Sequence, residues 1–166
     1  MKKSATVLIA PCIINAQFQA ELPRKSSHWG AAFEELLKSR GVKIILLPCT
    51  ETGFCGIPRK KHGVDYYQSL EGYPEYCAQL AQDTAEMVLS LIREGQEIVA
   101  CLGVEHSPSC AVSYMYTHNG MVKRAGIFFE KLFAKLDEGG VNLRKIGINR
   151  RHPQKAYIQL RNMLDG

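Results

Sequence analysis

Four short apolar runs, each followed by a segment of helical periodicity, constrain the fold of this chain more than any other feature. The first run, Ala-Thr-Val-Leu-Ile-Ala, contains no charged side chain. Continuous apolar runs with β-branched residues are typical of strands that are buried on both faces. We therefore expect four buried strands, at residues 5–10, 42–47, 97–102 and 145–149.

Helical patterns lie between and after these strands, with apolar side chains recurring at the spacing of one helix face. Capping signals mark several ends: Ser27 precedes the first helix, Gly41 and Gly95 follow the first two, and Pro153 opens the last. We expect helices at residues 28–40, 75–93, 128–137 and 153–164.

The alternation of strands and helices favours an α/β fold: a doubly wound, Rossmann-like, mainly parallel sheet of about four strands with helices on both faces. Residues 1–166 contain no linker or repeat, so we expect a single domain. Residues 48–74 are predicted to form a long loop, and residues 111–124 an excursion of undecided structure. Long loops on a rigid sheet often carry functional residues.

Charge and hydropathy narrow the class of partner. Twenty-one Lys and Arg against sixteen Asp and Glu give a formal charge of +5, which suits an anionic small molecule. With only 8% aromatic residues, a dedicated nucleic-acid-binding protein is disfavoured. No segment approaches the roughly 20 apolar residues that span a bilayer, and residues 5–10 are too short for an export signal. We predict a cytoplasmic protein without a membrane partner; its oligomeric state stays open.

Six cysteines in a reducing compartment indicate metal binding, redox chemistry or simple packing rather than disulfides. Cys12, Cys49 and Cys110 each follow one of the first three predicted strands. Because parallel strands end at the same edge of a sheet, we expect these three thiols to converge there. Such a soft-ligand site suits an iron–sulfur cluster or zinc.

The other cysteines have different predicted places. Cys77 and Cys101 lie within a helix and a strand, so we assign them to the core or the helix surface. Cys55 lies in the loop after Cys49, where it can act as a fourth ligand or a persulfide carrier. No cysteine is followed by arginine at the spacing of a phosphate-loop nucleophile, which disfavours a cysteine-dependent hydrolase.

Polar residues next to the three cysteines offer further chemistry. Glu51 can serve as a general base for water, whereas the alternative is a solvated loop carboxylate. Ser107, Ser109 and His106 can hydrogen-bond a substrate. For His106 the alternative is a surface pair with Glu105.

Two basic segments are predicted at the same edge of the sheet, residues 59–62 and residues 150–152. They can bind a phosphate or carboxylate on a substrate, although many charge runs are solvated loops. Arg59 is the stronger candidate for a substrate contact.

Three motifs carry a resemblance to a known family. They are Ala10-Pro11-Cys12, then Cys49-Thr50-Glu51 followed by Gly53, Gly56 and Pro58-Arg59, and finally Ser107-Pro108-Ser109-Cys110. With these motifs the chain resembles the 2-thiouracil desulfurase family, and more closely its desulfidase-related branch, over roughly its first two thirds.

The resemblance implies a specific cofactor and reaction. Cys12, Cys49 and Cys110 would hold a 4Fe-4S cluster with one iron that no protein side chain ligates. Glu51 would activate water, and Ser107 would assist at the substrate. Water would then replace sulfur on a small thiocarbonyl compound without redox change, and sulfide would leave.

Departures from the family pattern concern the substrate. Thiouracil-acting members carry a Cys-Leu-Leu-Gly-type turn and an Arg-Tyr-Asp-Gly segment where residues 13–18 read Ile-Ile-Asn-Ala-Gln-Phe. Thr50 stands where proline is usual. We expect Asn15, within that segment, to contact the substrate. The predicted function is a cluster-dependent desulfurase; the alternative is a non-catalytic iron–sulfur or zinc-binding module that carries sulfur or senses it.

Overall fold

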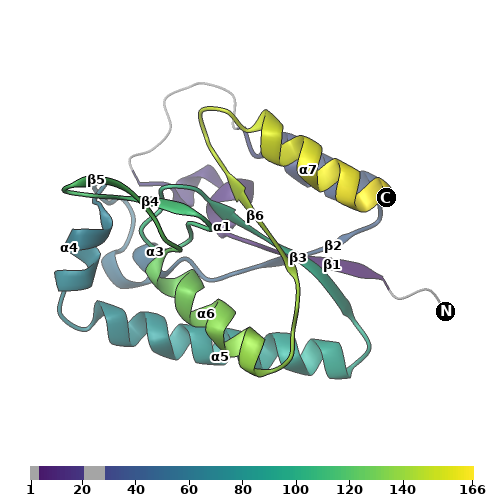
Figure 1. Cartoon of the computed structure of the whole chain (residues 1–166), viewed down its shortest axis with the longest axis horizontal. Coiled ribbons are helices and arrows are strands. Elements are labelled where there is room, and N and C mark those ends of the chain that lie inside the picture. The colour runs from purple at the N-terminus through teal and green to yellow at the C-terminus, as the bar shows by residue number, and fades with distance from the viewer. Residues whose placement is uncertain (1–3, 21–28) are drawn as a thin grey trace.

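A four-stranded parallel sheet forms the centre of the computed structural model, which describes residues 4–20 and 29–166 (Figure 1). Its order across the sheet is β2-β1-β3-β6. The strands are β1 (Ala5–Ile9), β2 (Lys43–Leu46), β3 (Glu97–Val104) and β6 (Arg144–Ile148). This confirms the predicted doubly wound α/β fold, and the observed strands match the four apolar runs to within a few residues.

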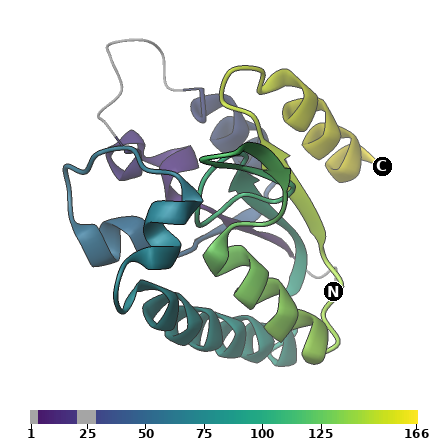
Figure 2. The same cartoon turned by 60° about the vertical axis from the view of Figure 1, so that its left-hand side comes forward.

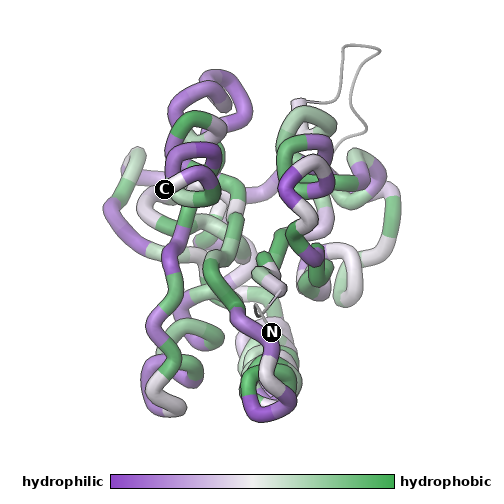
Figure 3. The backbone as a smooth tube through the Cα atoms, turned by 90° about the vertical axis from the view of Figure 1, so that its right-hand side faces the viewer, coloured by the Kyte–Doolittle hydropathy of each residue, from purple (hydrophilic) through white to green (hydrophobic). Residues whose placement is uncertain are grey.

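Strand β1 lies between β2 and β3, which explains its continuous apolar sequence. Val7, Leu8 and Ile9 are fully buried, and the tube of hydropathy in Figure 3 shows the central strands as mainly apolar. Ile9 pairs with Leu46 on β2 and with Leu102 on β3. This register brings the residues that follow β1, β2 and β3 to one edge of the sheet, at the point where the strand order reverses.

Two pairs of helices cover the two faces of the sheet (Figure 2). The first pair is α2 (Ala31–Ser39) and α7 (Gln154–Asp165), and the second is α5 (Tyr73–Arg93) and α6 (Ile127–Glu138). The rings of Phe33 on α2 and Tyr157 on α7 meet edge to face, with their centroids 5.7 Å apart. The buried side of α6 includes Leu132 and Leu136. All four predicted helices are present; the predicted cap at Ser27 lies outside the described residues.

The prediction of a long loop at residues 48–74 is wrong. This segment contains two short helices, α3 (Thr50–Cys55) and α4 (Val64–Ser69). Helices of six residues are too short to show a repeating apolar stripe, and packing rather than intrinsic propensity stabilises them. Buried Val64 and Tyr67 anchor α4 in this way.

Two further segments acquire structure that the sequence leaves open. The chain after β1 forms α1 (Pro11–Ile14) and a 3₁₀ turn, η1 (Ala16–Phe18). The undecided excursion contains an antiparallel hairpin of β4 (Tyr114–Thr117) and β5 (Gly120–Lys123). No helix among the described residues is long and apolar enough to cross a membrane.

Candidate active site

A cavity of about 600 Å³ lies beyond the carboxyl ends of the strands. Segments that follow β1, β2, β3 and β6 all contribute to its wall, so residues far apart in sequence share one space. Cys12, Cys49 and Cys110 line it, together with Glu51 and Ser107. The structure thus brings together the three cysteines that follow predicted strands.

Cys12 and Cys110 lie near enough to Cys49 for its charge to influence their ionisation. Burial raises the pKa of Cys12 to about 12, and the charges of Cys49 and Glu51 add to this effect. Burial likewise raises the pKa of Cys110 well above its usual value, with further contributions from Cys49 and Cys12. Three thiolates in this cavity would need a compensating positive charge, which a metal group would supply if one were bound.

The three cysteines that line the cavity are sulfur donors, and thiolates are the protein ligands that iron–sulfur clusters take. No three Cys, His, Asp or Glu side chains within residues 4–20 and 29–166 are grouped so as to hold a metal ion.

Local structure places two of these cysteines. Cys49 is the N-cap residue of α3, where its Sγ accepts a hydrogen bond from the backbone N–H of Thr52 at 3.4 Å. Cys110 ends a turn in which Ser107 Oγ accepts from the backbone N–H groups of Ser109 (3.3 Å) and Cys110 (3.1 Å). A Cβ added at Gly126 would collide with the backbone of Ser109, so this turn needs a glycine beside it.

Glu51 lies in the first turn of α3 and is only 6% exposed. Its Oε2 accepts a hydrogen bond from Ser107 Oγ at 3.4 Å, and its Oε1 lies 3.6 Å from Arg59 Nε. Burial raises the pKa of the Tyr67 hydroxyl, and the charge of Glu51, to which it is hydrogen-bonded, raises it further. The interpretation of Glu51 as a solvated loop carboxylate is therefore wrong.

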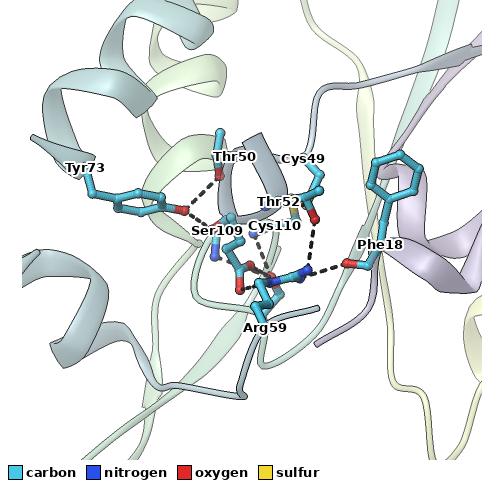
Figure 4. A network of polar contacts seen from close by, with 10 residues as sticks. Phe18, Cys49, Thr50, Thr52, Arg59, Tyr73, Ser109 and Cys110 are labelled. Carbon is cyan, nitrogen blue, oxygen red and sulfur yellow. Dashed lines mark hydrogen bonds and ion pairs between the residues drawn. The ribbon is translucent and has the colours of Figure 1, made fainter. Parts of the chain in front are cut away.

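Arg59, predicted to contact substrate, lies at the cavity wall with protein partners (Figure 4). Its Nη1 donates to Thr52 Oγ1 at 2.8 Å, and its Nη2 donates to the backbone oxygen of Phe18 at 2.7 Å. Thr52 Oγ1 in turn lies 3.2 Å from Cys49 Sγ. The guanidinium thus joins α3 to η1.

A second buried network lies on the other side of α3, also drawn in Figure 4. The Tyr73 hydroxyl lies 2.9 Å from Thr50 Oγ1 and 2.6 Å from Ser109 Oγ. Ser109 is buried and is not among the residues that line the cavity. Its side chain therefore supports the turn, and nothing in its placement favours the predicted substrate contact.

His106 does line the cavity, with its ring 4.6 Å from that of Tyr116. Glu105 forms other contacts in place of the alternative surface pair with His106. The Glu105 carboxylate accepts hydrogen bonds from the backbone N–H groups of Val112 (2.8 Å) and Ser113 (3.0 Å).

Asn15 and Cys55 do not line the cavity. Asn15 is exposed and caps η1, with its side chain accepting from the backbone N–H of Gln17. Cys55 is exposed at the last residue of α3. Their placement lends no support to a substrate contact by Asn15 or to a fourth ligand at Cys55.

Five basic side chains line the mouth of the same cavity: Lys61, His62, Arg150, Arg151 and His152. They come from the two basic segments that the sequence predicts at this edge. The buried tyrosines behind the cavity, Tyr67 and Tyr73, carry no sequence signal that marks them as part of the site.

The fold is similar to that of a solved structure described as a 4Fe-4S-dependent thiouracil desulfidase, TudS. The TM-score is 0.53, the similarity covers 96% of this chain and 98% of that chain, and 17% of aligned residues are identical. No protein-family model and no curated protein sequence matches the chain. The likeness agrees with the α/β architecture described above.

Proposed function

We propose that this protein is an iron–sulfur-cluster-dependent desulfurase that removes sulfur from a small thiocarbonyl compound resembling thiouracil. The observation that carries the proposal is one cavity lined by three cysteines and a buried carboxylate, Glu51. The fold of the similar structure, whose description names a thiouracil desulfidase, supports the same reading.

Cys12, Cys49 and Cys110 are the proposed ligands of a 4Fe-4S cluster, with one iron left free of protein ligands. When bound, the cluster supplies a Lewis acid for the soft sulfur of a thiocarbonyl group. The net reaction replaces the carbon–sulfur double bond by a carbon–oxygen double bond, consumes one water and releases hydrogen sulfide, with no electron transferred to or from the protein.

Glu51 is the proposed general base that removes a proton from the attacking water. Besides the Tyr67 hydroxyl, its two oxygens contact the Ser107 hydroxyl at 3.4 Å and lie 3.6 Å from Arg59 Nε. A carboxylate has about four lone-pair sites, which leaves some for a water molecule. Proton transfer of this kind contributes typically about 10²- to 10⁴-fold in rate. Ser107 has two proposed functions, since it contacts Glu51 and also shapes the turn that bears Cys110.

The mouth of the cavity favours a substrate with an anionic group. Lys61, Arg150 and Arg151 line it and form no ion pair with any described residue. A carboxylate or phosphate on the substrate would pair with these cations. Burial and the charges of Cys49 and Glu51 raise the pKa of Cys12, and the positive charge of Arg150 partly opposes this rise, which supports an anionic group binding close to the cysteines.

The direct test is anaerobic purification followed by iron and sulfide analysis. We expect a brown protein with about four irons per chain that releases sulfide from thiouracil or a related thiocarbonyl compound. A colourless protein that binds one zinc would contradict the desulfurase. A brown protein that is inert to a broad thiocarbonyl panel would favour the non-catalytic sulfur carrier or sensor.

Single Cys→Ser variants provide the matched control. Changing Cys12, Cys49 or Cys110 should remove most of the iron, whereas Cys55→Ser should keep it, because Cys55 is exposed outside the cavity. Equal loss of iron in Cys55→Ser would require a different ligand set.

A further inference from the structure

We propose that Arg59 is a positioning residue that holds Glu51 and the Cys49-bearing start of α3 in place, instead of contacting the substrate. The inference rests on the proposed function only for what Glu51 does in the reaction. The contacts themselves can be tested without turnover.

Arg59 connects three segments through three different nitrogens. Nε lies 3.6 Å from Glu51 Oε1, Nη1 donates to Thr52 Oγ1, and Nη2 donates to the backbone oxygen of Phe18 in η1. The side chain is 8% exposed, so these groups hold it away from bulk solvent. A planar guanidinium can direct donors to separated acceptors at once, which a lysine ammonium on a flexible stem cannot do in the same way.

The contact with Thr52 extends this connection to the cysteine. Thr52 donates its backbone N–H to Cys49 Sγ at 3.4 Å, and its Oγ1 lies 3.2 Å from the same sulfur. A hydroxyl both donates and accepts hydrogen bonds. Thr52 can therefore accept from Arg59 while its own proton points to a Cys49 thiolate, so that one arginine fixes both Cys49 and Glu51.

The geometry between Arg59 and Glu51 suits a carboxylate that must accept a proton. At 3.6 Å the pair is longer than a hydrogen bond, and Nε is buried without a hydrogen-bond partner. The positive charge therefore stabilises the carboxylate without occupying its lone pairs. A close bidentate pair would occupy both oxygens and leave less capacity to bind and deprotonate water.

A thermal double-mutant cycle tests the pairing without any assay of turnover. Arg59→Met leaves a buried carboxylate without its cation, so we expect the Tm to fall by about 10 °C. Adding Glu51→Gln removes the uncompensated charge, and the double variant should recover a large part of that loss. Additive effects of the two changes would overturn the proposal.

The exposed pair of Arg40 and Asp165 is the matched control, since Arg40 Nε donates to Asp165 Oδ1 at 2.7 Å on the protein surface. Arg40→Met and Asp165→Asn should each shift the Tm by about 2 °C or less, with no recovery in the double variant. If the Arg40/Asp165 double variant recovered as much Tm as the Arg59/Glu51 double variant, the recovery would reflect charge pairing in general and not the buried Arg59–Glu51 contact.

Kinetics distinguish a positioning residue from a substrate contact. We expect Arg59→Lys to lower kcat by about 10²-fold with KM within about twofold, because Glu51 is displaced while substrate binding is retained. A raised KM with unchanged kcat would overturn the proposal. Arg59→Gln, which also removes the positive charge, replaces Arg59→Met in the thermal cycle if the latter does not fold. If the wild-type protein releases no sulfide, the proposed function fails, whereas the thermal cycle still decides the pairing.

Discussion

Two buried polar networks begin at consecutive residues of α3 and reach opposite sides of the Cys110 turn. Thr50 contacts Tyr73, which contacts Ser109; Glu51 contacts Ser107 and lies beside Arg59. The Thr50 network consists of uncharged groups, three hydroxyls and the Cys77 thiol, and lies away from the cavity, whereas the Glu51 network is charged and lines it.

The distances that join the two networks to their partners differ. The Tyr73 hydroxyl makes contacts of 2.6 and 2.9 Å, whereas Glu51 lies 3.4 Å from the Ser107 hydroxyl and 3.6 Å from Arg59 Nε. Buried hydroxyls stabilise a structure best when they satisfy one another fully. A general base needs free lone pairs instead. We infer that the Thr50 network supplies rigidity and the Glu51 network supplies chemistry, and the following predictions test this division.

The largest expected effect is a difference in the rate of sulfide release between a variant of Glu51 and a variant of Thr50. Glu51→Gln should lower sulfide release by about 10²- to 10⁴-fold while the protein keeps its brown colour. Thr50→Val should keep the rate within about threefold and lower stability instead, because it removes one buried hydrogen bond. Undiminished turnover in Glu51→Gln would remove Glu51 as the base.

Ser107 and Ser109 give the second contrast, measured as steady-state rates of sulfide release. Ser107→Ala removes the hydroxyl that contacts Glu51 and accepts from Cys110 N–H, so we expect roughly a tenfold loss. Ser109→Ala, on the far side of the turn, should change the rate by about twofold or less. Similar losses in both variants would contradict the division between the networks.

Tyr73→Phe should affect stability with little effect on rate. It leaves the buried Thr50 and Ser109 hydroxyls without their partner, at a cost of about 1–3 kcal/mol in the free energy of unfolding. Urea denaturation measures this cost. Tyr66→Phe is the control, because Tyr66 is exposed on the neighbouring helix α4 and should change stability by less than about 0.5 kcal/mol.

The smallest expected effect concerns an exposed contact outside both networks. Hydrogen bonds from the backbone N–H and ring of His118 hold the pKa of Asp65 below its usual 3.8. Because the pKa of Asp65 is lower in the folded protein than in the unfolded one, the contact stabilises the folded protein at pH values above the unfolded pKa. This contribution is lost as the pH falls through the folded pKa. Asp65→Ala should therefore lower the urea midpoint slightly at neutral pH, and the difference should shrink in acid. A difference that persists unchanged in acid would contradict this account.

Several features were predictable from the sequence because they depend on local patterns. Four continuous apolar runs indicate four buried strands, and alternation with helices indicates their parallel arrangement. The position of Cys12, Cys49 and Cys110 just after strands is enough to bring them to one edge. Which of them bind a metal remains a prediction.

Other features depended on the tertiary structure. Ser107 and Ser109 belong to one tight turn, and only the packing of that turn against Tyr73 decides which hydroxyl faces the cavity. Arg59 donates a hydrogen bond to Phe18, which is 41 residues away in sequence, so no local pattern shows that the guanidinium N–H groups already have acceptors. The helices α3 and α4 are likewise stabilised by contacts rather than by a repeat. Local sequence patterns therefore specify the sheet and the edge where the cysteines meet, while long-range packing selects which side chains face the cavity and which support it.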